Sequence, residues 1–250
     1  MKHIVYFITI LVSTFVVAQN NEVFTKGNTL YNDGKFQDAI SVYETILDGN
    51  VHSSELYYNL ANAYYKLNRI APSIYYYEKA LQLAPNDKDI KNNLAFANNM
   101  TIDAIEVLPE VGFSKFTKQI TNRFSFDTWA VIAVVLVIGF VILFLTYYFS
   151  YGTAGKRLAF LSSFSCLFIT CVALFFAFKK YNFDQKDKPA IVFAQESNVK
   201  SEPNLRSEGV FDLHEGTKVQ IIELYKENWA KIKLADGETG WIPIEDIKAL

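Results

Sequence analysis

The chain has 250 residues and a formal net charge of −2, so it has no excess of basic charge that would attract nucleic acid, and we expect no nucleic-acid partner. Hydrophobic residues make up 51% of the sequence and are concentrated in the first seventeen residues and in residues 126–178, which leaves two flanks of ordinary soluble composition. Composition therefore favours a multidomain membrane protein.

The N-terminus is typical of a secretory signal peptide, covering residues 1–18. A positive start at Lys2 precedes an apolar run, residues 4–17, that is too short to span a bilayer comfortably. The run ends in Val16-Val17-Ala18, which suits cleavage before Gln19, and no cysteine follows that would make a lipoprotein. We expect the chain after residue 18 to be exported; an uncleaved anchor is the alternative.

Residues 19–100 contain an internal repeat with a period of 34 positions. The recurring positions are Val23, Gly27, Leu30, Ala39, Tyr43 and Ile46, matched by Tyr57, Ala61, Tyr64, Ser73, Tyr77 and Ala80. This period, with Pro85 closing the second helix pair, resembles the tetratricopeptide repeat family, although Val51 replaces the closing proline of the first pair. The resemblance predicts two repeats and a capping helix over residues 87–99. An array this short needs support, which we expect from the membrane or from a partner.

In this family the first helix of each repeat lines a concave groove for a segment of another protein. Two triplets at helical spacing occupy that helix one repeat apart: Phe24, Asn28 and Tyr31, then Tyr58, Asn62 and Tyr65. Asparagine can hold a peptide backbone by paired donor and acceptor contacts while rings cover its apolar groups. We expect these six residues to bind a protein partner. The alternative is that the tyrosines are packing residues and the asparagines are solvated.

Residues 101–125 form a juxtamembrane stretch with an amphipathic pattern. Four apolar side chains fall within one arc of a helix: Phe113, Phe116, Ile120 and Phe124. The pattern predicts a helix on the membrane surface, with its lysines at lipid phosphates and its phenylalanines in the acyl boundary, so membrane lipid is an expected partner. Packing of this helix on the repeat domain is the alternative.

Residues 126–178 predict a hairpin of two membrane-spanning helices, over residues 126–149 and 158–178, with a connecting loop at 150–157. No charge lies between Asp127 and Lys156, and none lies within the second run, so transport by this chain alone is not expected. Trp129 lies at the expected headgroup boundary. Small residues recur along the second helix, where they allow close approach of another helix: Ala159, Ser163, Cys166, Thr170, Ala173 and Ala177.

Two signals disagree about the orientation of this hairpin. An exported N-terminal flank places both soluble flanks outside, because two spans return the chain to the same side. The basic residues of the connection, Lys156 and Arg157, are outnumbered by those that flank the hairpin, which opposes this orientation under the positive-inside rule. Because the signal engages the export machinery before either span exists, we expect the signal to decide.

After a polar linker at residues 179–189, residues 190–250 change to a period of two. Ala230, Ile232 and Leu234 alternate with Trp229 and two lysines, and Asp236-Gly237 marks a turn. The pattern predicts a small all-β barrel.

Several runs of this segment resemble bacterial SH3 domains: Asn198-Val199-Lys200-Ser201-Glu202-Pro203, Leu213-His214-Glu215-Gly216, Trp229-Ala230-Lys231-Ile232 and Gly240-Trp241-Ile242. Members of that family bind cell-wall peptides or protein segments. The acidic and tyrosine motif of eukaryotic SH3 grooves is missing, so binding of proline-rich peptides is not implied. We expect Trp229 and Tyr225 to contact a ligand and Trp241 to lie in the core.

Outside the signal and the spans, the sequence has only two histidines, His52 and His214, in different domains, and no cysteine. Zinc ligation and a histidine-based nucleophilic triad therefore lack parts, and no phosphate-binding glycine motif is present. We expect no catalytic site, no metal site and no cofactor.

The order of signal, repeats, two spans and terminal SH3-like domain resembles the Bacteroides aerotolerance, or Bat-type, membrane proteins. The resemblance implies a two-pass protein of the bacterial inner membrane with both soluble domains periplasmic, acting with Bat-type proteins that carry von Willebrand-type domains. The expected function is an adaptor for membrane or periplasmic protein partners. One alternative is an anchor or sensor that binds peptidoglycan peptide through the SH3-like domain, and another is a pair of cytoplasmic domains on an uncleaved anchor.

Overall fold

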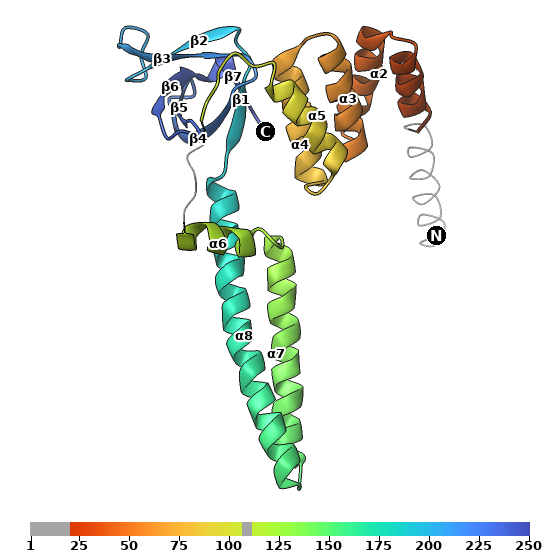
Figure 1. The fold of residues 1–250 in the computed structure, drawn as a ribbon, viewed down its shortest axis with the longest axis vertical. Coiled ribbons are helices and arrows are strands. Elements are labelled where there is room, and N and C mark those ends of the chain that lie inside the picture. Colours follow the sequence, from red (N-terminus) through yellow and green to blue (C-terminus); the bar gives the residue numbers. More distant parts are fainter. Residues whose placement is uncertain (1–20, 107–111) are drawn as a thin grey trace, which may run out of the picture. The chain divides into compact units, whose positions relative to one another are not determined.

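The computed structural model describes residues 21–106 and 112–250, so the expected signal peptide lies outside the described residues. The chain divides into two compact units. The first combines the residues up to Glu106 with Pro189–Leu250, and the second is made of the residues between them, up to Lys188. Segments that lie before and after the apolar helices in the sequence therefore fold together. Figure 1 shows the elements of both units.

The first unit begins with the repeat helices, which we call the repeat array. A helix over residues 21–32 is followed by α2 (Phe36–Asp48), α3 (Ser54–Lys66), α4 (Ile70–Leu83) and α5 (Lys88–Asn98). Capping side chains set two of the starts: Ser53 Oγ accepts a hydrogen bond from Leu56 N at 3.1 Å, and the Asp87 carboxylate accepts one from Ile90 N at 3.1 Å. The expected helical array is confirmed.

Small residues let the helices of the array cross closely. A Cβ atom at Gly27 would lie 2.4 Å from Cε1 of Tyr43, so only glycine fits there. At the equivalent crossing one repeat later, Ser73 Oγ donates a hydrogen bond to the Ala61 carbonyl oxygen at 3.1 Å. Tyr43 and Tyr77 fill the core beside these crossings. Burying a large apolar side chain in this way stabilises the fold by roughly 1.5–3 kcal/mol.

Residues 189–250, all of which are described, form a seven-stranded antiparallel sheet that we call the C-terminal sheet. Its strands are β1 (Pro189–Val192), β2 (Glu196–Lys200), β3 (Gly209–His214), β4 (Lys218–Tyr225), β5 (Trp229–Lys233), β6 (Thr239–Pro243) and β7 (Ile247–Ala249). They are ordered β3-β2-β6-β5-β4-β1-β7, with the 3-10 helix η1 (Ile244–Asp246) before β7. Ala230, Ile232 and Leu234 are buried in its core. The expected small all-β domain is confirmed.

The expectation that Trp241 lies in the core of the sheet is wrong. In β6 the buried residues are Gly240 and Ile242, whereas Trp241 is only half-buried and lies on the other face. A Cβ atom at Gly240 would lie 2.4 Å from Cγ1 of Val199, because Val199 already fills the core at this point. Trp241 instead stands opposite Lys231 of β5, whose Nζ lies 5.8 Å from the centre of the indole ring.

Within the first unit, the repeat array and the C-terminal sheet share a hydrophobic core. Ile191 of β1 is fully buried in the same cluster as the repeat residues Ile74 and Tyr75. The Tyr75 ring meets the Phe193 ring edge-on with their centres 5.7 Å apart, and Lys248 Nζ lies 4.5 Å from the centre of the Tyr75 ring. The short array is therefore supported by the chain's own C-terminal sheet, a source that the sequence did not indicate.

Polar contacts close the same interface. Asp103, which follows α5, accepts hydrogen bonds from the His214 backbone N–H at 2.7 Å, from His214 Nδ1 at 2.7 Å and from Thr217 Oγ1 at 2.6 Å. Glu78 of α4 pairs with Lys218 of β4, with Oε1 and Nζ 2.7 Å apart. Two independent charged contacts thus fix the orientation of the sheet on the array.

The second unit consists of α6 (Gly112–Thr121), α7 (Phe126–Phe149) and α8 (Thr153–Lys186). Helices α7 and α8 pack along each other as a hairpin, and α6 lies across α8 (Figure 1). Helix α8 is longer than the span expected over residues 158–178. It takes up much of the expected loop at 150–157 and of the expected linker at 179–189, since residues 179–186 contain no proline or glycine that would stop a helix.

Among the described residues, α7 and α8 are long and apolar enough to cross a membrane. Helix α7 has 24 residues and is about 36 Å long, which exceeds the hydrocarbon thickness of about 30 Å. Five members of the small-residue stripe of α8 are buried in the hairpin: Ala159, Ser163, Thr170, Ala173 and Ala177. The stripe is therefore used by the contact between α8 and α7.

Candidate functional site

The first triplet of the repeat array is tied into its interior. Asn28 Oδ1 accepts hydrogen bonds from Tyr43 Oη at 2.7 Å and from Asn59 Nδ2 at 2.9 Å. The Phe24 ring packs on the Tyr43 ring at 5.9 Å, and Tyr31 is half-buried. The acceptor oxygen of Asn28 thus joins neighbouring helices, and a ligand would meet the amide nitrogen as a donor.

The second triplet repeats this arrangement one period later. Asn62 Oδ1 accepts hydrogen bonds from Tyr77 Oη and from Asn93 Nδ2, the latter at 2.9 Å. Asn93 Nδ2 also donates to Tyr58 Oη at 2.9 Å. Burial raises the pKa of Tyr77 well above its ordinary value, and burial raises that of Tyr43 to about 12, so both hydroxyls stay protonated as donors. The two asparagines are equivalent structural acceptors.

Three of the six expected groove residues, Tyr31, Asn62 and Tyr65, line one cavity of about 180 Å³. Phe24, Asn28 and Tyr58 do not line it. The cavity is completed by Lys66, Tyr77, Asn93 and Phe96, of which the sequence analysis named none as a contact. The 34-residue period points to two of these four residues, because Asn93 and Phe96 lie 34 positions after Asn59 and Asn62. Phe96 is 60% exposed, so an apolar ring is open to a partner here.

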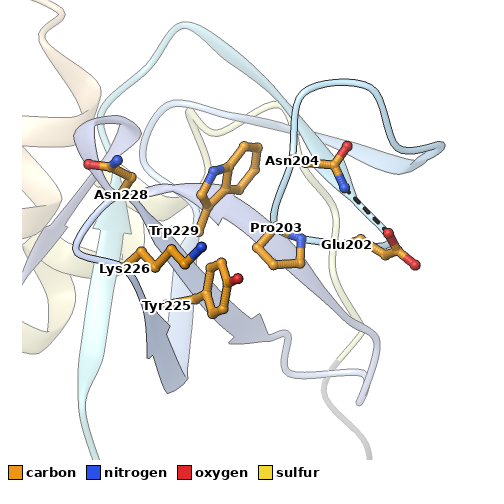
Figure 2. Close-up of a pocket in the computed structure, with 7 residues that line it drawn as sticks. All are labelled: Glu202, Pro203, Asn204, Tyr225, Lys226, Asn228 and Trp229. Carbon is orange, nitrogen blue, oxygen red and sulfur yellow. Dashed lines mark hydrogen bonds between the residues drawn. The ribbon is translucent and has the colours of Figure 1, made fainter.

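In the C-terminal sheet, Tyr225 and Trp229 lie opposite each other where β4 meets β5. They line a cavity of about 560 Å³ together with Glu202, Pro203, Asn204, Lys226 and Asn228 (Figure 2). Its size is within the range of small-ligand and peptide pockets. Pro203 and Asn204 come from the loop between β2 and β3, which brings that loop to the aromatic pair.

The turn that carries Lys226 has an unusual backbone. Lys226 and Glu227 have φ values of +48° and +60°, in the left-handed region that non-glycine residues rarely adopt. Asn228 N donates to the Tyr225 carbonyl oxygen at 3.3 Å, which closes a two-residue turn. The turn directs the Lys226 side chain toward the Tyr225 ring (Figure 2), and Nζ lies 5.1 Å from the centre of that ring. Strain of this kind is common at binding sites.

Trp229 also lines a second cavity, of about 270 Å³. Asn228 is shared by both cavities, and Leu205, Pro243 and Glu245 belong to the second. Trp241 contributes its ring beside Tyr225, with centres 6.1 Å apart. The pair expected from the sequence therefore lies in a longer aromatic strip, to which loops add a carboxylate at Glu202 and an ammonium at Lys226.

The residues expected at a membrane surface gather at one end of the hairpin. Trp129 Nε1 donates to the Thr121 carbonyl oxygen at 3.2 Å, and its ring stacks on Phe176 at 5.2 Å and meets Phe124 edge-on at 5.2 Å. Phe116 is exposed and Ile120 is half-buried, whereas the side chain of Phe113 lies outside the described residues. Helix α6 packs on α8 and belongs to the hairpin unit.

Two parts of the chain match known protein families. Residues 24–88 match the tetratricopeptide repeat family, and residues 196–248 match the bacterial SH3 domain family. A search of the curated proteins found no match. Both matched domains are non-catalytic types that point to protein binding. Among the described residues, no three His, Cys, Asp or Glu side chains are grouped so that they could hold a metal ion.

Proposed function

We propose that this protein is a membrane-anchored adaptor that presents two recognition surfaces on one rigid body. The observation that carries the proposal is the common core of the first unit, in which Ile191 of the C-terminal sheet is buried among repeat residues. The repeat array would hold a partner segment, and the aromatic strip of Tyr225, Trp229 and Trp241 would hold a second ligand. The shared core would keep the two at a constant separation. The proposed setting is a Bat-type complex of the bacterial inner membrane, with this chain as a member of the BatE kind and von Willebrand-domain proteins as partners.

The connectivity of the chain supports the anchor. Residues up to Glu106 and residues from Pro189 onward fold together, although the hairpin separates them in the sequence. Both flanks must then lie on the same side of the membrane, which two spans allow and one span would forbid. The predicted signal peptide favours the periplasmic side.

Reporter fusions test the compartment. A reporter active only in the periplasm, fused after residue 106 or after Leu250 of the full chain, is expected to be active at both positions. Activity at neither position would place both domains in the cytoplasm and reject the periplasmic part of the proposal. Activity at only one would contradict the shared core.

The repeat surface is tested at Phe96, because this ring is exposed and contributes little to the stability of the fold. We expect Phe96→Ala in the full-length protein to weaken capture of co-expressed Bat-type von Willebrand-domain proteins by about tenfold, the loss of one well-buried contact at an interface. Leu83→Ala, an exposed apolar residue of α4, is the matched control. Equal capture by the wild type and Phe96→Ala would remove the groove from the proposal.

A second candidate is a peptidoglycan-binding anchor, favoured by the aromatic strip, in which Trp229 lines two cavities. It predicts that the detergent-solubilised full chain is retained on purified sacculi and that Trp229→Ala abolishes retention. Ile222→Ala, an exposed residue of β4 outside both cavities, is the control. No retention of the wild type would reject this candidate and leave a protein segment as the ligand of the strip.

A further inference from the structure

A cavity of about 400 Å³ lies in the second unit, where α6 meets the final turns of α8. Lys118 and Asn122 line it from α6 and the residues just after it, and Lys179, Asn182, Phe183 and Lys186 line it from α8. The four α8 residues follow the spacing i, i+3, i+4 and i+7, so they share one face of that helix. Lys118 Nζ lies 5.6 Å from the centre of the Phe183 ring, which fixes its direction.

The lining of this cavity selects an anion. It contains three ammonium groups, two carboxamides and two threonine hydroxyls, and Lys118 and Lys186 also make contacts within the protein. Asp184, a nearby carboxylate of α8, pairs with Lys180 at 2.8 Å and does not line the cavity. Ammonium and amide N–H groups converging on one space are suited to phosphate oxygens, which accept several hydrogen bonds at once.

The position of the cavity along the hairpin matches the headgroup layer of a membrane. The apolar run of α8 ends at Phe178, and Trp129, whose Nε1 donates to the Thr121 carbonyl oxygen, joins the start of α7 to the end of α6 at the same level. Asn182 is four residues beyond Phe178 and therefore about 6 Å farther along the helix axis. A headgroup layer is roughly 5–8 Å thick on each side of the bilayer.

Exposed apolar side chains on the helices that carry the cavity distinguish a lipid from a free phosphate. Phe178, directly before Lys179 in α8, is 65% exposed, and Phe116, two residues before Lys118 in α6, is 58% exposed. Acyl chains would cover these rings while the phosphate meets the lysines. A free phosphate would leave them uncovered.

We propose that this cavity binds the phosphate group of an anionic membrane phospholipid. The inference rests on the proposed insertion of α7 and α8 in a membrane. A bound lipid would hold α6 against α8 and set the depth of the hairpin in the bilayer.

The test uses the full-length protein in detergent, titrated with phosphatidylglycerol or phosphatidylcholine and monitored by native mass spectrometry. Each basic side chain near an anionic headgroup strengthens binding about fivefold, so Lys118→Gln with Lys179→Gln should weaken phosphatidylglycerol binding about 30-fold. Lys156→Gln with Arg157→Gln removes two charges at the other end of the hairpin and should leave the affinity unchanged. Lys118→Arg with Lys179→Arg keeps the charges and should retain binding.

Three results would overturn the proposal: equal affinity of the Gln pair and the wild type, equal loss in the control pair, or displacement of the lipid by inorganic phosphate at the same concentration. Alkaline extraction of membranes separates this failure from that of the anchor. Release of the wild-type chain by alkali would reject membrane insertion. Retention of the chain without a preference for phosphatidylglycerol would reject the lipid site alone.

Discussion

Gly216 lies where the C-terminal sheet touches the repeat array, and its lack of a side chain allows the contact. A Cβ atom there would lie 2.8 Å from Ile70 Cγ2 and 2.9 Å from Thr101 Cγ2, and the residue has a φ of +90°. We expect Gly216→Ala to destabilise the protein by about 2–4 kcal/mol, since steric crowding adds to backbone strain. Denaturant unfolding measures this change.

Gly34→Ala is the matched control for this substitution. Gly34 also has a positive φ, +77°, but nothing lies within 4 Å of the added Cβ atom. It should lose only the strain contribution, about 1 kcal/mol. Equal losses at the two glycines would show that the contact at Gly216 is looser than the structure indicates.

Glu227 stores backbone strain in the turn that carries Lys226. Its φ of +60° costs a residue with a Cβ atom about 1–2 kcal/mol. Glycine removes this strain but loses more conformational entropy on folding, so Glu227→Gly should raise the free energy of unfolding by about 0.5–1 kcal/mol. Thermal unfolding measures the gain. Glu208→Gly, at a position without a positive φ, should give none, and a loss of stability in Glu227→Gly would show that the turn is not strained.

At the scale of elements, the contact of the segment after α5 with the end of β3 depends on pH. Its hydrogen bond to Asp103 raises the pKa of His214, with further support from Glu196 and Asp212. Burial would raise the pKa of Asp103, but hydrogen bonds from His214 and Thr217 outweigh it and lower the pKa overall. The contribution of His214 to the free energy of unfolding is therefore fully present below its unfolded pKa and is lost as the pH rises through its raised folded pKa. The contribution of Asp103 is lost as the pH falls through its lowered folded pKa.

We accordingly expect the free energy of unfolding to be larger at about pH 6 than at about pH 9. His214→Gln should remove this difference, whereas His52→Gln should keep it, because His52 makes its hydrogen bonds with Asn50 and Tyr57 and not with Asp103. Denaturant titrations at the two pH values decide the matter. An unchanged difference in His214→Gln would assign the pH dependence to other groups.

The hydrogen bonds of Asn62 join α3, α4 and α5, so this residue stabilises the fold and also lines the cavity of about 180 Å³ in the repeat array. Asn62→Ala leaves Tyr77 Oη and Asn93 Nδ2 without their acceptor, and we expect a loss of about 1–3 kcal/mol in unfolding free energy. Asn92→Ala, on the exposed face of α5, is the control. If Asn62→Ala were as stable as the control, the asparagine would be reserved for ligands.

Features that depend on neighbouring residues could be predicted from the sequence, whereas contacts between distant segments could not. The repeat helices and the alternation of β5 follow from local periodicity, which the sequence displays directly. The prediction for Trp241 is wrong because alternation separates the two faces of a strand but does not show which face is buried. Val199 of β2 packs against the face of Gly240, so the opposite face carries Trp241. In the sequence, Ile191 looks like an ordinary strand residue and Gly216 like an ordinary turn glycine. Their roles at the shared core could not be predicted, because the repeat residues that they contact, such as Ile74 and Ile70, lie more than a hundred positions away.

At the scale of the whole molecule, the account depends on the repeat array and the C-terminal sheet acting as one body. The hairpin interrupts the sequence of that body without dividing its core. Under the proposed function, the two recognition surfaces of this body would hold two ligands at a fixed distance from each other, which independent domains on flexible linkers cannot do.

Hydrogen exchange of the full-length protein with Ile191→Ala tests this claim most directly. The residue belongs to β1 but is buried in the repeat core, so its truncation should cost about 2–5 kcal/mol and lower the protection of amides in α4 and α5 as well as in β1. Ile222→Ala, an exposed residue of β4, should leave both regions protected. Faster exchange confined to the C-terminal sheet, with α4 and α5 unchanged, would contradict the single body and with it the proposed adaptor.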